Sequence, residues 1–178
     1  GKDVALVSSG DAGIYGMGAA LFEVLEQRDW TEAEVNVSPG ITALNATSAL
    51  LGAPAGQDFA SVSLSDLLTP WETIRDRVSH ALKGDFVLAI YNPKSKDRHH
   101  QLPEVLEMAR EYRSDDTPVG IVHQGYRDGQ SVDTVSLSDV PVETIDMLTT
   151  VIIGNSMTRT FGDWMYTPRG YTTEVTPA

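Results

Sequence analysis

Val-Ser-Ser-Gly-Asp-Ala-Gly-Ile-Tyr-Gly-Met-Gly, residues 7–18, is a glycine-rich stretch with one aspartate that directly follows the apolar run Val4-Ala5-Leu6-Val7. An apolar run that ends in glycines is typical of a strand leading into a loop, because glycine lets the backbone approach a ligand closely. We therefore expect a strand at residues 4–8 and a small-molecule cleft at its end.

Outward from this loop, hydrophobic periodicity predicts alternating helices and strands. The expected helices span residues 16–28, 41–51, 69–83 and 103–113, and the expected strands span residues 34–38, 61–64, 86–91, 118–123, 131–137 and 150–153. We expect Thr69 to cap the third helix, with Pro70 at its first position and Glu72 completing a capping box. The β-α-β order favours a parallel core, and the last strands favour a mixed sheet within an α/β fold.

The composition is that of a globular protein of 178 residues with 41% hydrophobic residues and no cysteine. No apolar run is long enough to cross a membrane and no secretory signal is present, so we expect a cytoplasmic protein. The net charge of -12 argues against a nucleic-acid partner, since phosphate binding needs clustered Lys and Arg. This acidity is explained by solubility or by adaptation to a salty cytoplasm.

A basic segment, Pro-Lys-Ser-Lys-Asp-Arg-His-His at residues 93–100, holds two of the four lysines. It is either a solvated loop or the binding site of a negatively charged ligand. Its place after the expected strand 86–91 supports the ligand, because α/β folds bind ligands at the carboxyl ends of strands. His99 and His100 would point about 100° apart on a helix, so we expect no metal site.

Several motifs together resemble the tetrapyrrole (corrin/porphyrin) methylases, which use S-adenosylmethionine. The motifs are Ser-Ser-Gly-Asp-Ala-Gly-Ile-Tyr-Gly at 8–16, Ser-Pro-Gly-Ile-Thr-Ala at 38–43, Ile-Tyr-Asn-Pro-Lys-Ser-Lys-Asp-Arg at 90–98 and Ile-Ile-Gly-Asn-Ser-Met-Thr-Arg at 152–159. With Met-Tyr-Thr-Pro-Arg-Gly-Tyr at 165–171, the set looks like the branch that methylates C-17 of precorrin-3B, with ring contraction, in cobalamin biosynthesis. The resemblance covers essentially the whole chain.

The resemblance implies a fold of two α/β lobes with partly parallel mixed sheets that hold the cofactor between them. The residues it implies for S-adenosylmethionine binding are Ser9, Gly10, Asp11, Ile14, Thr42, Ala43, Asn92 and Gly125. Several of them also have a purely structural interpretation. Asp11 and Thr42 are suited to capping helices, Ile14 to a core, and Gly125 to a turn.

The tetrapyrrole substrate is a polycarboxylate, which gives the basic residues a purpose as carboxylate anchors. The expected anchors are Lys94, Lys96, Arg98, Arg159 and Arg169, although Arg159 and Arg169 would alternatively pair with acids on the protein surface. Methyl transfer depends mainly on positioning and needs no strong protein nucleophile. Ring contraction would benefit from an acid or base, for which Asp11, Tyr15 and His123 are candidates by residue type.

Members of the family begin with an upstream strand whose loop carries Gly-x-Gly-Pro-Gly, and this pattern is absent from residues 1–178. We therefore expect residues 1–56 to be the later part of a first lobe whose N-terminal part is missing, and residues 57–178 to be the second lobe. The resemblance also implies a homodimer.

Two other functions stay open: a sister methylase acting at another ring position, or a truncated non-catalytic module that binds S-adenosylmethionine or S-adenosylhomocysteine. The Thr-Pro-Arg-Gly-Tyr ending at 167–171 favours the precorrin-3B branch over a sister methylase. The sequence leaves undecided whether the substrate already contains cobalt.

Overall fold

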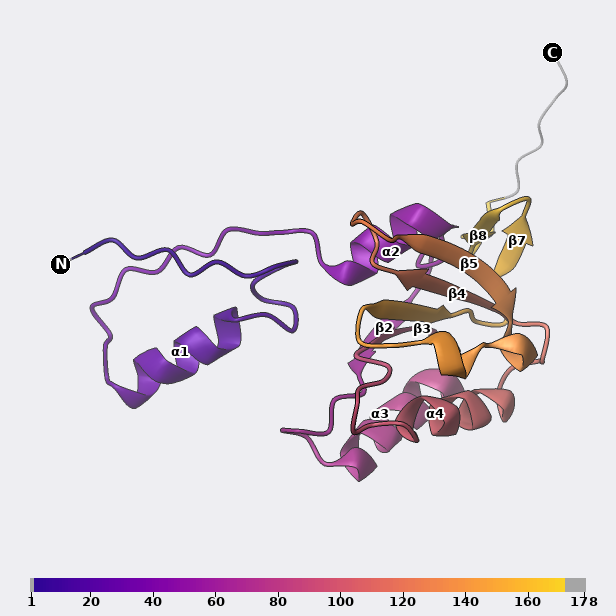
Figure 1. Ribbon diagram of the computed structural model, residues 1–178, viewed down its shortest axis with the longest axis horizontal. Coiled ribbons are helices and arrows are strands. Elements are labelled where there is room, and N and C mark those ends of the chain that lie inside the picture. The colour runs from indigo at the N-terminus through magenta and orange to yellow at the C-terminus, as the bar shows by residue number, and fades with distance from the viewer. Residues whose placement is uncertain (1, 172–178) are drawn as a thin grey trace, which may run out of the picture. The chain divides into compact units, whose positions relative to one another are not determined.

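The apolar runs predicted as strands form a five-stranded mixed sheet with the order β2-β3-β6-β4-β5 (Figure 1). Its strands are β2 (Phe59–Ser63), β3 (Val87–Tyr91), β6 (Thr149–Ile153), β4 (Pro118–His123) and β5 (Ser131–Ser136). β2 and β3 pair in parallel, while β6 is antiparallel to both β3 and β4, and β5 is antiparallel to β4. The α/β class and the mixed sheet are thus confirmed.

Within this five-stranded sheet, the expectation of a parallel core holds only for the pair β2–β3. β6 lies between β3 and β4, and all five of its residues are buried. An apolar strand buried on both faces is most stable in the middle of a sheet, so β6 separates two strands that the chain order would have paired.

One face of the sheet is covered by α3 (Trp71–Lys83) and α4 (Gln101–Arg110). Apolar side chains of both helices and of the sheet form the main core, which includes Ile74, Val78, Leu88, Val105 and Ile153. Helix α2 (Ala43–Leu51) contributes Leu51 against Gly120 of β4. A Cβ atom on Gly120 would lie 2.3 Å from Leu51 Cδ1, so glycine permits this close packing.

The predicted helix starts need two corrections. Pro70 is the N-cap residue of α3, and no side chain caps the helix, so the expected cap by Thr69 is wrong. The Pro70 carbonyl instead accepts hydrogen bonds from the N–H groups of Thr73 and Ile74. α4 begins two residues before the expected start, because Pro103 is tolerated in a first turn whose N–H groups have no helical partner.

A second, three-stranded sheet with the order β1-β8-β7 was not predicted. It contains β1 (Gly52–Ala53), β8 (Trp164–Tyr166) and β7 (Arg159–Phe161). Gly52, expected only to end a helix, has φ of 124° and begins β1. Two short 3-10 helices, η1 (Leu137–Asp139) and η2 (Val142–Thr144), link β5 to β6.

This computed structural model describes residues 2–171, and the chain divides into two units, Gly1–Ala46 and Thr47–Ala178. The first unit contains α1 (Gly18–Gln27), close to the predicted 16–28. The strands predicted at 4–8 and 34–38 are absent among its described residues. A strand is stabilised by its ladder, and these segments pair with no strand in the described part of the chain. The predicted boundary at 56/57 falls inside the second unit.

Candidate functional site

The glycine-rich loop of the first unit is organised by the carboxylate of Asp11. Its Oδ1 accepts a hydrogen bond from the N–H of Gly13 at 2.8 Å, and its Oδ2 accepts one from the N–H of Gly40 at 2.9 Å. The second bond joins two of the motifs identified in the sequence, which lie 29 residues apart. These hydrogen bonds, with Gly40 the stronger influence, hold the pKa of Asp11 below its ordinary value.

Glycine is required where the two motifs meet. A Cβ atom on Gly40 would lie 2.0 Å from the carbonyl oxygen of Gly10, so no other residue fits without moving the backbone. Gly10 itself has φ of 75° and lies beside Ile41 and Thr42. The structure therefore brings together Gly10, Asp11 and Thr42 of the predicted cofactor residues.

The remaining predicted residues of this unit surround that contact. Thr42 is buried and directly precedes α2, which Ala43 begins. Ser9 is exposed, Ile14 is 45% exposed, and Tyr15 has a left-handed backbone with φ of 53°. Asp11 does not cap α1, because the helix begins at Gly18 with Met17 as its N-cap. Its carboxylate instead bridges the two loops.

In the second unit, Asn92 and Gly125 follow β3 and β4, which run in the same direction on either side of β6. Both residues therefore lie at the same edge of the sheet, which we call the carboxyl edge (Figure 1). The Asn92 amide donates to Ser63 Oγ at 2.9 Å, and Gly125 lies between Gln124 and Tyr126, which both have positive φ. Ligands of α/β folds bind at such an edge.

Arg98, a predicted substrate anchor, is 8% exposed and bonded within the protein. Its guanidinium donates to the carbonyls of Leu64 at 2.9 Å and Asn92 at 2.7 Å, and also contacts Met147 Sδ at 3.5 Å. The basic segment is therefore not simply a solvated loop. Arg98 ties together three segments of the carboxyl edge.

The other basic candidates differ in exposure. Lys94 Nζ donates to the carbonyl of Val142 at 3.1 Å, whereas Lys96 is exposed. Arg159 on β7 and Arg169 near the end of the described chain are both exposed. No group of three His, Asp or Glu side chains in residues 2–171 is arranged to hold a metal ion.

His123, the last residue of β4, has an acidic partner that the sequence did not reveal. Its Nε2 lies 3.3 Å from Asp146 Oδ2, and its Nδ1 lies 3.4 Å from the carbonyl of Gly129. Burial raises the pKa of Asp146, but hydrogen bonds from Leu148 and Thr149 and the nearby His123 outweigh it, so this pKa is lowered overall. Asp146 is a single acid in an irregular segment, and no local pattern marks it.

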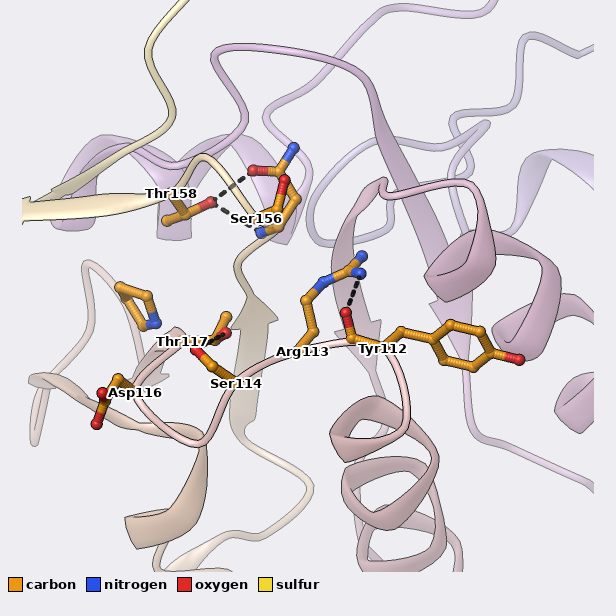
Figure 2. Close-up of a pocket in the computed structure, with 9 residues that line it drawn as sticks. Tyr112, Arg113, Ser114, Asp116, Thr117, Ser156 and Thr158 are labelled. Carbon is orange, nitrogen blue, oxygen red and sulfur yellow. Dashed lines mark hydrogen bonds between the residues drawn. The ribbon is translucent and has the colours of Figure 1, made fainter.

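A polar cavity of about 270 Å³ lies at the opposite edge of the sheet. It is lined by residues after α4 and after β6, including Arg113, Ser114, Ser156 and Thr158 (Figure 2). Arg113 points toward the segment with Ser156 and donates to the carbonyls of Tyr112, Gly154 and Phe86. These bonds connect parts of the fold, and none of the predicted site residues lines this cavity.

Among residues 2–171, none of the helices has the length and apolar character that a membrane span requires.

The second unit is an α/β fold with polar loops at the carboxyl edge of a mixed sheet, and the first unit contains a glycine-rich loop; each feature by itself is typical of proteins that bind small organic ligands. Residues 1–141 match the family model described as Tetrapyrrole (Corrin/Porphyrin) Methylases. The chain belongs to this family.

Named relatives share this similarity over nearly the whole chain. The chain is 49% identical to the cobalt-factor III methyltransferase of Priestia megaterium, covering 99% of this chain and 33% of that protein. It is 43% identical to the probable cobalt-factor III C(17)-methyltransferase of Salmonella typhimurium, covering 97% and 71%. The chain thus spans about a third of the first relative's length and about 70% of the second's.

Solved structures agree with the fold. The crystal structure of the methyltransferase CobJ superposes with a TM-score of 0.87 at 44% identity, over 91% of this chain and 68% of that chain. A uroporphyrin-III C-methyl transferase from Thermus thermophilus, complexed with S-adenosyl homocysteine, superposes with a TM-score of 0.57 at 19% identity, over 82% and 62%. The second similarity concerns the fold alone.

Proposed function

We propose that this chain supports S-adenosylmethionine-dependent methylation at C-17 of precorrin-3B or its cobalt-containing form, with ring contraction, in cobalamin biosynthesis. The observation that carries the proposal is the 43% identity, over 97% of the chain, to a protein named as a probable cobalt-factor III C(17)-methyltransferase. The Thr-Pro-Arg-Gly-Tyr ending at 167–171 is consistent with this branch of the family. Both relatives described above are named for cobalt-factor III, which makes the cobalt-containing substrate the first to test.

Residues of the glycine-rich loop region in the first unit, and of the loops after β3 and β4 in the second unit, fit S-adenosylmethionine in chemical type. The cofactor supplies an electrophilic methyl group, and it carries a positive sulfonium and ribose hydroxyls. The proposed contacts are Ser9, Gly10, Asp11, Ile14, Thr42 and Ala43 of the first unit, and Asn92 and Gly125 of the second. Asp11 with its lowered pKa and the backbone groups of the glycine loop offer polar partners without a competing cation.

For the substrate carboxylates we assign direct pairing to the exposed cations Lys96, Arg159 and Arg169. Lys94 and Arg98 already donate to backbone carbonyls, so we assign them to hold the basic segment in place. This division follows from the number of donors each side chain has left for a ligand. The negatively charged carboxylates of the substrate would thus pair with exposed cations, which are few in this acidic chain.

Among the three acid–base candidates, we favour His123. Asp11 uses both carboxylate oxygens to accept backbone hydrogen bonds, whereas His123 lies beside a carboxylate at the carboxyl edge of the sheet. The neighbouring carboxylate of Asp146 fixes the orientation of the His123 ring, and a positioned side chain is what acid–base catalysis requires. Tyr15 is 54% exposed in the glycine loop and stays a weaker candidate.

The deciding experiment incubates the full-length protein with methyl-labelled S-adenosylmethionine and, in separate reactions, cobalt-factor III and precorrin-3B. We expect label to enter the tetrapyrrole with at least one of them, at C-17 by NMR. Label at another ring carbon would establish a sister methylase. Calorimetric binding of S-adenosylhomocysteine without any transfer would establish a non-catalytic binding module. Light scattering would test the homodimer that the family resemblance implies.

A further inference from the structure

His123 lies where two neighbouring strands of the five-stranded sheet meet at the carboxyl edge. It is the last residue of β4, and in the antiparallel register it lies opposite Thr149, the first residue of β6. Gly125, one of the proposed cofactor contacts, follows two residues later in the chain. The side chain of His123 is 27% exposed. The ring is therefore partly enclosed by protein and still reachable from solvent, as a group that exchanges a proton with a ligand must be.

The carboxylate of Asp146 is held in one orientation by residues at the start of β6. Its Oδ1 accepts hydrogen bonds from the N–H of Leu148 and from Thr149 Oγ1, both at 2.9 Å. Thr149 is 3% exposed, and its hydroxyl also accepts a hydrogen bond from the N–H of Asp146 at 3.3 Å. Because two donors occupy Oδ1, the oxygen that faces His123 is Oδ2, which lies 3.3 Å from Nε2.

The ionised carboxylate selects the nitrogen of His123 that carries a hydrogen. Burial raises the pKa of Asp146, but the hydrogen bonds from Leu148 and Thr149 and the nearby imidazole lower it overall, so Asp146 is ionised at neutral pH. An ionised carboxylate only accepts hydrogen bonds, and a neutral imidazole has a single N–H. An N–H that donates to a carboxylate forms a bond about twice as strong as one that donates to a neutral carbonyl. The hydrogen therefore lies on Nε2.

The other ring nitrogen, Nδ1, then carries a lone pair. The carbonyl of Gly129 lies 3.4 Å from Nδ1, in an exposed turn where Gly129 has φ of 83°. A lone pair and a carbonyl oxygen are both acceptors, so the neutral ring forms no hydrogen bond there. Once Nδ1 has taken up a proton, the same carbonyl is placed to accept its N–H. Nδ1 is therefore the ring atom that is able to exchange a proton with a ligand.

We propose that Asp146 and Thr149 are positioning residues that hold His123 in its Nε2–H form, so that Nδ1 exchanges a proton with the substrate. This inference rests on the proposed function, in which His123 is the acid or base of ring contraction, and it names the working atom. When His123 acts as a base, an O–H or C–H bond of the substrate breaks, its electron pair stays on the substrate, and the proton bonds to Nδ1. Proton return from Nδ1 reverses this step.

The first test reads the tautomer in the full-length protein labelled with ¹⁵N-histidine. His123 is one of four histidines, and its ring signals are identified by their absence from His123→Gln. At a pH where the ring is neutral, long-range ¹H–¹⁵N spectra should show a pyridine-type Nδ1 and a pyrrole-type Nε2. A pyrrole-type Nδ1 in the wild-type protein would overturn the inference without any variant of Asp146.

Asp146→Asn gives a second result, because Oδ1 accepts from the N–H of Leu148. The amide oxygen of the new side chain takes that place, and its NH₂ group then faces Nε2 as a donor. We expect the ring to switch to the Nδ1–H form. With methyl-labelled S-adenosylmethionine and the tetrapyrrole that accepts label, kcat for the ring-contracted product should fall about a hundredfold or more, while KM changes little.

Asp133→Asn is the matched control, because Asp133 is an exposed aspartate on β5, the other neighbour of β4. It should keep the wild-type tautomer and kcat. Thr149→Ser retains the hydroxyl and should also behave like the wild type, whereas Thr149→Val should shift both the tautomer and kcat toward those of Asp146→Asn. The calorimetric affinity for S-adenosylhomocysteine should be the same in every variant.

A wild-type tautomer in Asp146→Asn, or an equal fall of kcat in Asp133→Asn, contradicts the positioning role. Loss of S-adenosylhomocysteine binding in Asp146→Asn would indicate misfolding, and the two Thr149 variants then decide by the same criteria. The proposed function fails separately, if the wild-type protein transfers no label to a tetrapyrrole. That result removes the proton exchange with the substrate, while the tautomer spectra still decide whether Asp146 selects the form of His123.

Discussion

At the scale of single residues, the glycine loop depends on the carboxylate of Asp11 and on the absence of a side chain at Gly40. Asp11 bridges Gly13 and Gly40, and Gly40 leaves room for the carbonyl of Gly10. The sequence motif marked these residues as important, but it did not show that they contact one another. Their spacing of 29 residues carries no local signal.

Gly40→Ala is expected to disrupt the loop, because the new Cβ would lie 2.0 Å from a backbone oxygen that only a backbone shift can relieve. Calorimetry should show S-adenosylhomocysteine affinity falling by about tenfold or more. Gly13→Ala is the control, since its Cβ would meet only the Asp11 side chain, at 3.3 Å. Equal affinities for the two variants would contradict a tight contact at Gly40.

The lowered pKa of Asp11 predicts a pH dependence. The ionised carboxylate is the form that accepts both backbone hydrogen bonds, so their stabilisation is fully present above the unfolded-state pKa of about 3.9. It is lost as the pH falls through the lower folded-state value. Amide NMR shifts of Gly13 and Gly40 should move together in that acidic window, and Asp11→Asn should abolish the shared titration.

Arg98→Leu should destabilise the second unit by about 2–4 kcal/mol, because it leaves the carbonyls of Leu64 and Asn92 without their donor. Urea unfolding followed by circular dichroism measures this free energy. Lys96→Leu removes an exposed cation from the same segment and should change stability by no more than about 0.5 kcal/mol. Similar losses in both variants would mean that Arg98 does not hold the edge together.

At the scale of elements, helix boundaries and strands followed from periodicity where each segment buries one face. β4 was predicted at its observed bounds, and β5 and β6 within one residue. The segments at 4–8 and 34–38 have the same apolar character but lack partner strands among the described residues. The hairpin of β7 and β8 was missed because three-residue strands give too little alternation to recognise.

Packing of α2 on the sheet provides a test at this scale. Gly120→Ala should cost about 1–3 kcal/mol, since its Cβ would overlap Leu51 Cδ1. Combining it with Leu51→Ala should cost less than the sum of the two single changes, because the smaller side chain removes the overlap. A double-mutant cycle in urea measures the difference, and strict additivity would argue against this contact.

At the scale of the whole molecule, one side chain, Arg113, connects several chain segments of the second unit at the edge of the sheet opposite the carboxyl edge. Arg113, with a side chain 3% exposed, pairs with Asp85 at 3.0 Å and donates to the carbonyls of Phe86 and Gly154. Burial lowers the pKa of this guanidinium, although Asp85 opposes the change. The chain segments before β3, after α4 and after β6 are thus tied together by one side chain.

Arg113→Leu is therefore expected to lower the free energy of unfolding by about 2–4 kcal/mol. Arg110→Leu is the matched control, because Arg110 is a third exposed and its ion pairs with Glu107 and Asp115 lie at the surface. That variant should lose no more than about 1 kcal/mol. Thermal unfolding measures the difference. Equal melting temperatures for both variants and the wild type would contradict this role for Arg113.

The sequence by itself determined the α/β class, the positions of most strands and the family, because these depend on local periodicity and on motifs read within a few residues. It also identified the glycine loop and the basic segment. Only the tertiary structure placed β6 between β3 and β4, bridged Asp11 to Gly40, gave His123 its partner Asp146 and buried Arg98. Each of these depends on contacts between residues distant in sequence, where burial and hydrogen-bond satisfaction select one arrangement from many that local propensity allows.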